Sequence, residues 1–196
     1  ISEMPFSGDD LEAFKNGTDP YGHPDVNWYN EIFKSVASQS NMNVDVSGGS
    51  KSLRYFLSTG YFIQDGLIKD FSSQQHDVNT NYFYRRFNYR TNLDFDVTND
   101  LNMRLDFSTR FMNINEPSSM NATGEIYNFE KMTPYAAPVI NPNGSYTYLN
   151  TKGFLPTLNA RLANEGYKRT KRNDINILYG ASYKMDRLTK GLSANF

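Results

Sequence analysis

The sequence predicts an all-β fold, namely a segment of an antiparallel transmembrane β-barrel: about six strands of a larger barrel, with long extracellular loops. Two observations carry this prediction. Apolar and polar residues alternate with a period of two through most of 41–113 and again through 174–196, which is the pattern of strands with one apolar face. Short turns and long connections also alternate along the chain, as they do in outer-membrane barrels.

Residues 1–40 are expected to form an extracellular loop that contains a short helix. The segment mixes Gly, Pro, Asp and Asn, which favour turns. Within 25–37 apolar residues recur at helical spacing, after two possible N-cap residues, Asp25 and Asn27.

The first pair of strands is expected on either side of the two glycines at 48–49. Alternation runs from Met42 up to the glycines and resumes at Leu53. With the glycines as a two-residue turn, Val44 lies opposite Leu53 and Met42 lies opposite Tyr55. The apolar faces of the two strands then coincide, so the register is self-consistent.

The clearest alternation runs through 87–111 and predicts the next two strands, joined by a three-residue turn at 98–100. Apolar residues are odd-numbered on both sides of this turn, so the turn must hold an odd number of residues. Three residues place Val97 opposite Leu101.

The same register makes two further predictions. It sets Phe87 opposite Phe111 on the apolar face. On the polar face it sets Asp94 against Arg104, an opposite-charge pair of the kind that favours one register. With this second pair, four strands are expected within 41–113.

The fifth and sixth strands are expected in 174–196. Alternation there is interrupted around 187–190, and a four-residue turn at this point pairs Met185 with Leu192. The stretch 114–173 is therefore expected to be one long extracellular loop.

A membrane barrel is favoured over a soluble sheet by the lengths of strands and connections. The short turns near 48, 99 and 188 alternate with long connections at 64–82 and 114–173, so all short turns lie at one end of the sheet. The central strands run about 11 to 15 residues, whereas soluble strands are usually about 5 to 6 residues long. The alternative is a soluble all-β glycan-binding or adhesion module, which predicts that the segment folds alone without detergent.

Composition excludes several classes of protein. The 20 basic and 21 acidic residues give a net charge of −1 without a basic stripe, so nucleic acid is not an expected partner. The chain has no cysteine and its two histidines lack ligand-spaced neighbours, so no metal is expected. No catalytic motif is recognisable, so neither an enzyme nor a cofactor is expected. The first residues lack a signal-peptide pattern and the last ones alternate, so the chain is expected to be an internal segment.

Four stretches within the first part of the chain carry a specific order and spacing of motifs. They are D-V-N-W-Y-N-E-I-F (25–33), N-M-N-V-D-V-S-G-G-S (41–50), R-Y-F-L-S-T-G-Y-F-I-Q-D-G (54–66) and R-R-F-N-Y-R-T-N-L-D-F-D (85–96). Together they resemble the early barrel of the SusC/RagA family of TonB-dependent outer-membrane transporters. Beyond Glu116 the resemblance is only general.

The resemblance implies a barrel of about 22 strands that is plugged by an N-terminal domain lying outside this chain. It implies a place in the bacterial outer membrane and active import of oligosaccharides or peptides. The implied partners are the TonB complex, a SusD-like surface lipoprotein that acts as a lid, the transported substrate and the lipid bilayer.

Two sets of residues are candidate functional sites. Charged residues on the polar face of the strands are expected to line a wet lumen and a substrate path, because so many charges would not be buried in a dry core. They are Arg90, Asp94, Arg104, Asp106 and Arg110. Mutual pairing along the wall is the more ordinary use of such charges.

The second set consists of aromatic residues in the loops, which are candidates for contacts with substrate or lid. They are Trp28, Tyr135, Tyr146 and Tyr148. Aromatic rings stack on sugars, but long loops also need them for their own packing, and Trp28 in particular is expected to pack inward.

Overall fold

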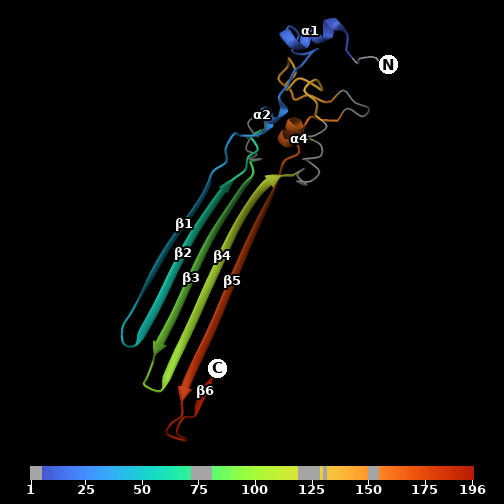
Figure 1. Cartoon of the computed structure of the whole chain (residues 1–196). Helices are drawn as coiled ribbons and strands as arrows, with labels where there is room; N and C mark the ends of the chain where they lie inside the picture. The colour runs from blue at the N-terminus through green and yellow to red at the C-terminus, as the bar shows by residue number, and fades with distance from the viewer. Residues whose placement is uncertain (1–5, 72–80, 119–128, 130–131, 150–154) are drawn as a thin grey trace, which may run out of the picture. The chain divides into compact units, whose positions relative to one another are not determined.

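The computed structural model describes residues 6–71, 81–118, 129, 132–149 and 155–196, so parts of both long connections lie outside the described residues. Six antiparallel strands form one sheet in the order β1-β2-β3-β4-β5-β6 (Figure 1). The prediction of an all-β segment is confirmed. The strands are β1 (Gln39–Gly49), β2 (Leu53–Asp65), β3 (Phe83–Asp96), β4 (Leu101–Pro117), β5 (Tyr167–Lys184) and β6 (Ser193–Asn195).

Within the described residues, three short helices accompany the sheet: α1 (Gly8–Asn16), α2 (Trp28–Ile32) and α4 (Leu158–Asn164). Among the described residues, none of the helices is both long and apolar enough to span a membrane. The chain divides into two compact units. The loop unit comprises 1–37, 66–82 and 115–168, and the strand unit comprises 38–65, 83–114 and 169–196.

The first hairpin differs from the expected register. Gly48 and Gly49 belong to β1, the turn follows them, and Met42 lies opposite Tyr61 rather than Tyr55. The predicted two-residue turn at the glycines is therefore wrong. A Cβ on Gly48 would lie 2.6 Å from the hydroxyl oxygen of Tyr55, and a Cβ on Gly49 would lie 2.5 Å from the backbone carbonyl oxygen of Leu53. The close approach of β2 therefore favours glycine at the end of β1.

The apolar faces of β1 and β2 nevertheless coincide, as predicted. A shift by an even number of residues along a strand returns every side chain to its own face. The even-numbered residues of β1 therefore share one face with the odd-numbered residues of β2 to β5, and this surface is called the apolar face below. The opposite surface of the sheet is called the polar face.

The second hairpin has the expected register. The amide of Val97 donates to the carbonyl of Leu101 over 2.9 Å, and the rings of Phe87 and Phe111 are stacked with centroids 6.4 Å apart. The hydroxyl of Thr98 accepts hydrogen bonds from the turn amides, which holds the turn closed. The predicted pairing of these two strands is thus confirmed.

The last hairpin pairs as expected but has a longer connection. The amide of Met185 donates to the carbonyl of Leu192 over 2.8 Å, and Lys184 lies opposite Ser193. Residues 186–191 lie between the paired positions, so the connection is longer than the predicted four-residue turn. β5 also begins at Tyr167, well before the predicted start at 174.

The loop unit has its own small core. Trp28 and Ile32 of α2 and Leu158 and Leu162 of α4 are buried there. Asn27 caps α2 by accepting from the amide of Asn30. The helix that was expected somewhere in 25–37 is therefore confirmed but occupies only its central part.

Candidate functional site

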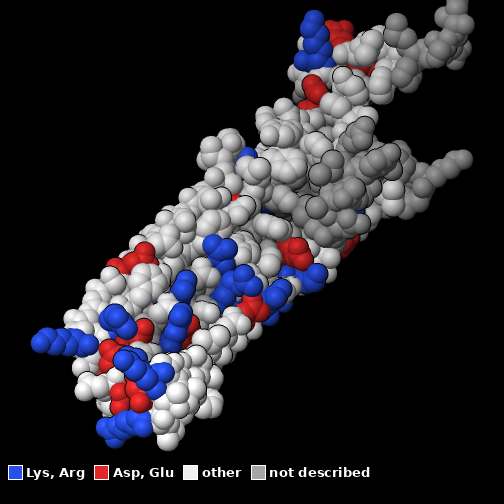
Figure 2. Space-filling view, turned by 60° about the horizontal axis from the view of Figure 1, so that its bottom comes forward, with Lys and Arg blue, Asp and Glu red and all other residues white. Residues whose placement is uncertain are grey.

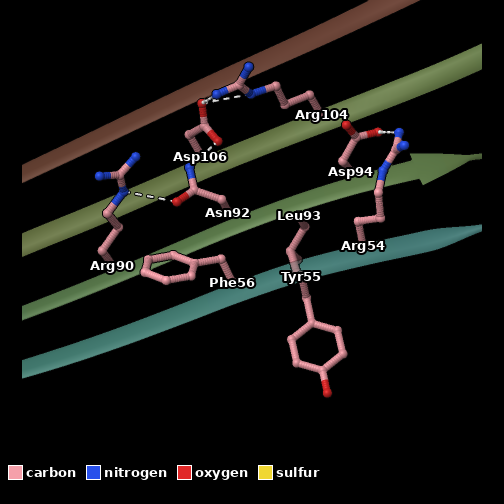
Figure 3. A pocket seen from close by; sticks show the side chains of 9 residues that line it. All are labelled: Arg54, Tyr55, Phe56, Arg90, Asn92, Leu93, Asp94, Arg104 and Asp106. Atoms are coloured by element: carbon pink, nitrogen blue, oxygen red, sulfur yellow. Dashed lines mark hydrogen bonds and ion pairs between the residues drawn. The ribbon is translucent and has the colours of Figure 1, made fainter. Parts of the chain in front are cut away.

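Four of the five charged residues predicted to line the lumen gather around one hollow on the polar face. The hollow has a volume of about 500 Å³ and lies across β2, β3 and β4. Its charged lining residues are Arg54, Arg90, Asp94, Arg104 and Asp106 (Figure 3). Tyr55 borders the same hollow, but its ring points away from these charges, toward the opposite face of the sheet.

The acidic residues of this hollow are held by neighbouring donors. Asp94 of β3 forms an ion pair with Arg54 of β2 over 3.2 Å and accepts from the amide group of Asn102 over 2.6 Å. Asp106 pairs with Arg104 over 2.7 Å and accepts from Asn92. The carboxylates are thus fixed in place and partly neutralised.

These contacts differ from the predicted pairing of Asp94 with Arg104. The register that opposes the two residues is present, but each side chain has a closer partner. Arg54 reaches Asp94 because β2 and β3 pair with these two residues directly opposite each other. Arg104 turns instead to Asp106, two residues along its own strand and on the same face.

Arg90 keeps most of its guanidinium available at the hollow. Its Nε donates to Asn92 over 2.8 Å, and its guanidinium carbon lies 6.0 Å from the centroid of the Phe56 ring. The residue is exposed. An exposed guanidinium beside an aromatic ring can receive a carboxylate or a hydroxyl-rich ligand, because Arg donates in a planar fork.

The fifth predicted residue, Arg110, lies away from the hollow. Its guanidinium binds Asp174 of β5 through Nε over 2.9 Å and through Nη2 over 2.5 Å. Arg172 contacts the same carboxylate over 3.1 Å. Arg110 therefore links β4 to β5. Basic and acidic side chains lie side by side along the sheet in Figure 2.

Sequence reasoning missed Arg54, Asn92 and Phe56 as members of the hollow. Arg54 and Phe56 are even-numbered residues of β2, on the opposite side from the apolar residues that defined the strand. The alternation therefore placed both on the polar face. Only the register between β2 and β3, which a long connection separates, brings them beside Asp94 and Arg90.

The four loop aromatics do not form one site. Trp28 is 3% exposed and its indole N–H donates to the carbonyl of Thr133 over 2.9 Å, so it packs inward. Tyr135 is 46% exposed and its ring lies 4.6 Å from that of Phe14.

The other two loop tyrosines differ in exposure. Tyr146 contacts Phe71 edge-on, with centroids 6.5 Å apart, and burial raises the pKa of its hydroxyl. Tyr148 is exposed and forms a β-bridge with Pro156. Tyr135 and Tyr148 are therefore the two of the four whose side chains are exposed.

His23 lies between two carboxylates of the loop unit. Its Nε2 is 3.0 Å from Asp10 and its Nδ1 is 2.9 Å from Asp19. The hydrogen bond to Asp10, followed by that to Asp19, raises the pKa of His23. Donation from the backbone of Ser7, together with the contact with His23, lowers the pKa of Asp10 to about 2.

Replacing Asp10 by Asn is expected to lower the pKa of His23, because the imidazolium loses its first carboxylate. A raised pKa in the folded state means that the contact stabilises the fold at pH values below the unfolded pKa of histidine. This contribution is lost as the pH rises through the folded pKa. Titration of the His23 imidazole by NMR measures the change. Asp9→Asn, in the same helical turn, is the control, and equal shifts in both variants would contradict the assignment.

Among the residues that the structure describes, no group of three or more His, Cys, Asp or Glu side chains is arranged to hold a metal ion. The hollow on the polar face offers charged and amide groups for binding. It does not combine a nucleophile with a general base.

No family model matches the chain. Two curated proteins of Formosa agariphila match parts of it. TonB-dependent receptor P3 is 34% identical over 77 residues, which are 39% of this chain and 6% of that protein. TonB-dependent receptor P26 is 23% identical over 128 residues, 65% of this chain and 11% of that protein. The chain thus spans a small part of the length of these relatives.

Two solved structures are similar in fold. The RagAB peptide transporter matches with a TM-score of 0.60 over 90% of this chain and 19% of its own chain, at 19% identity. The RagAB peptide importer in its closed-closed state matches with a TM-score of 0.56 over 82% of this chain and 17% of its own, also at 19% identity.

These similarities and the two-faced sheet define the class of structure: a segment of an antiparallel β-barrel wall that stays open within this chain. The chain resembles part of a SusC/RagA-type TonB-dependent receptor, as its sequence motifs predicted.

Proposed function

We propose that this chain is part of the wall and the outer loops of a TonB-dependent importer in the bacterial outer membrane. In this proposal the importer carries oligosaccharides or peptides, is covered by a SusD-like lipoprotein and draws energy from the TonB complex through parts of the protein outside this chain. It is a transporter and not an enzyme. The likeness in fold to the RagAB peptide importer favours peptides.

The observation that carries this proposal is the apolar face of the sheet. Six of its large side chains on β1 and β5 are half exposed or more. They are Met42 53%, Val44 60%, Val46 50%, Ile175 60%, Ile177 68% and Tyr179 57%. Exposed large apolar side chains on this scale mark a contact with a membrane or a partner, and the charged opposite face is what a water-filled lumen requires.

The hollow on the polar face is the proposed substrate path. Arg54, Asp94, Arg104 and Asp106 neutralise one another, while Arg90 and Phe56 present a cation and a ring together. A peptide carboxylate fits the free part of the Arg90 guanidinium. A sugar fits the Phe56 ring and the neighbouring amide of Asn92. Tyr135 and Tyr148 are the proposed loop contacts with substrate or lid.

Cysteine labelling of the full-length protein tests the proposal. Val44 and Asp45 are adjacent in β1, are both exposed here and lie on opposite faces. This segment contains no other cysteine. In outer membranes, a water-soluble maleimide is expected to label Asp45→Cys at least tenfold faster than Val44→Cys, because a thiol in hydrocarbon is shielded from the reagent. A fluorophore on Val44→Cys is expected to be quenched by brominated lipid.

Equal labelling of the two cysteines would contradict the membrane wall. So would recovery of the full-length protein from the soluble periplasm. Either result would favour the soluble glycan-binding module, whose two exposed positions in β1 would both face water.

A further inference from the structure

The apolar face changes character at the end of the strands that leads into the long connections. One row near this end contains Tyr61, Phe87 and Phe111, of which Tyr61 lies opposite Phe87 and Phe87 stacks on Phe111. In the next row toward the long connections, the same face carries Arg85 on β3, opposite Ile63 of β2, and Lys171 on β5.

The strand register places these two basic residues in one row. The amide of Lys184 donates to the carbonyl of Asp100, and antiparallel pairing from this point sets Lys171 opposite Asn113 of β4. β3 pairs with β4 on its other edge, and the register of this second hairpin sets Arg85 opposite Asn113. Arg85 and Lys171 are thus two strand spacings apart, which is about 10 Å.

A hollow of about 280 Å³ lies on the sheet at this row. It is lined by both basic residues of this row, by Asn113 and Asn173, by Tyr61, Phe87 and Phe111, and also by Arg86 and Met112. The side-chain oxygen of Asn113 is buried without a hydrogen-bond partner, so it is free to accept from a hydroxyl or an N–H. The size is just below the range of pockets that enclose a whole ligand, about 300 Å³ and more, and suits part of a headgroup.

The basic residues of this row lack the anionic partners that four arginines of the polar face have. On the polar face, Arg54, Arg104, Arg110 and Arg172 each contact an aspartate. Arg85 instead lies 4.7 Å over the Phe83 ring. Neither Arg85 nor Lys171 has an ion pair within the part of the chain that the structure describes, and both are exposed.

The height of the apolar face places this row at a membrane surface. From Val97 to Phe87 the strand rises about 34 Å at about 3.4 Å per residue. With a tilt of about 40°, this corresponds to about 26 Å along the barrel axis, close to the apolar band of about 25 Å in outer-membrane barrels. The stacked rings end the band as an aromatic girdle does, and the basic row follows at headgroup level.

We propose that Arg85 and Lys171, with Asn113 between them, bind the phosphorylated headgroup of a membrane lipid in the leaflet next to the long loops. The cations neutralise phosphate, the amide side chain meets headgroup hydroxyl or N–H groups, and the girdle contacts the acyl chains. This inference rests on the proposed membrane wall. It assigns a lipid site to the outside of the barrel, on the face opposite the proposed substrate path.

Lipid binding by the full-length protein in a neutral detergent tests the site. Diphosphoryl lipid A is titrated, and the bound lipid is counted by native mass spectrometry. The double variant Arg85→Gln/Lys171→Gln is expected to lower the affinity roughly 30-fold, since each basic residue near an anionic surface contributes about fivefold. The charge-conserving variant Arg85→Lys/Lys171→Arg is expected to retain most of the affinity.

Two controls make the result specific. Arg54→Gln/Arg90→Gln removes two basic residues from the polar face and is expected to leave lipid A binding unchanged. Dephosphorylated lipid A is expected to bind the wild type as weakly as the Gln variant binds the phosphorylated form. Inorganic phosphate at matched concentration is expected not to compete, because it lacks acyl chains.

The proposed lipid site is wrong if the Arg85/Lys171 Gln variant binds lipid A as tightly as the wild type does. It is also wrong if the Arg54/Arg90 Gln control loses as much affinity for lipid A as that variant is expected to lose. Competition by inorganic phosphate would make the row a simple anion site and would equally overturn a lipid site. Labelling of Val44→Cys and Asp45→Cys reports the membrane wall independently. If Asp45→Cys is labelled faster than Val44→Cys but the Arg85/Lys171 Gln variant binds lipid A as the wild type does, only the headgroup site is rejected. Equal labelling of the two cysteines would reject both proposals.

Discussion

Ile177→Arg is expected to destabilise the full-length protein in lipid vesicles by about 2 to 4 kcal/mol, the cost of a cation on the lipid face near the bilayer midplane. Ile177 lies in the middle part of β5, on the apolar face, and is 68% exposed. In a water-soluble protein, a substitution at so exposed a position changes stability by only about 0.5 kcal/mol. The size of the effect therefore reports whether this surface meets lipid or water.

The neighbouring residue provides a matched control. Leu178 is 58% exposed and lies on the polar face of the same strand. Leu178→Arg is expected to change stability by no more than about 0.5 kcal/mol, as at other exposed positions. The midpoint of guanidinium unfolding in vesicles, followed by the gel mobility of the folded barrel, measures both variants. Similar midpoints for the two would contradict a lipid contact at Ile177.

The sequence predicted the faces of the strands better than their register. Alternation assigns each residue to a face, but pairing shifted by two residues satisfies the same faces. In the second hairpin the turn is short and both strands alternate up to it, so Val97 and Leu101 could be paired correctly. In the first hairpin the two glycines suggested a turn, but they lie within the strand, where a Cβ on Gly49 would come within 2.5 Å of the backbone carbonyl oxygen of Leu53.

Elements without apolar alternation were predicted least well. The first part of β5, from Tyr167 to Asn173, is almost entirely polar, and hydrogen bonding to the neighbouring strand extends it nonetheless. α1 was not predicted, although Ser7 and Asp10 form a capping box and Gly17 ends the helix in a left-handed conformation. These signals are specific, but they are short and lie among other turn-forming residues.

The sequence predicted four of the charged residues that belong to the candidate site, but it did not predict the contacts between them. Arg90, Asp94, Arg104 and Asp106 could be placed on one face from their even numbers. The ion-pair partner of Asp94 could not be predicted, because Arg54 belongs to a strand joined to β3 only through a long connection. Such a connection fixes no register, so contacts across it follow from the structure alone.

Trp28→Ala is expected to destabilise the loop unit by about 3 to 5 kcal/mol, the usual cost of removing a buried Trp. The indole is 3% exposed, packs in the core with Ile32 and Leu162, and donates to the carbonyl of Thr133. The truncation leaves a cavity and removes one of the two hydrogen bonds to the Thr133 carbonyl, which also accepts from the amide of Ala136 over 3.0 Å. Because Trp28 is the largest side chain in the buried core of the loop unit, this loss is expected to open it locally.

Hydrogen exchange of the full-length protein measures this opening, with amides of the loop unit compared with those of the strand unit. Tyr29→Ala is the matched control, because Tyr29 is adjacent in α2 and is 61% exposed. Protection of the loop unit is expected to fall at least a hundredfold in Trp28→Ala and less than tenfold in Tyr29→Ala. The strands are expected to keep their protection in both, since their pairing does not depend on α2. If the two variants lost protection equally, Trp28 would not be a core residue, and a role in binding substrate or lid would have to be considered for it again.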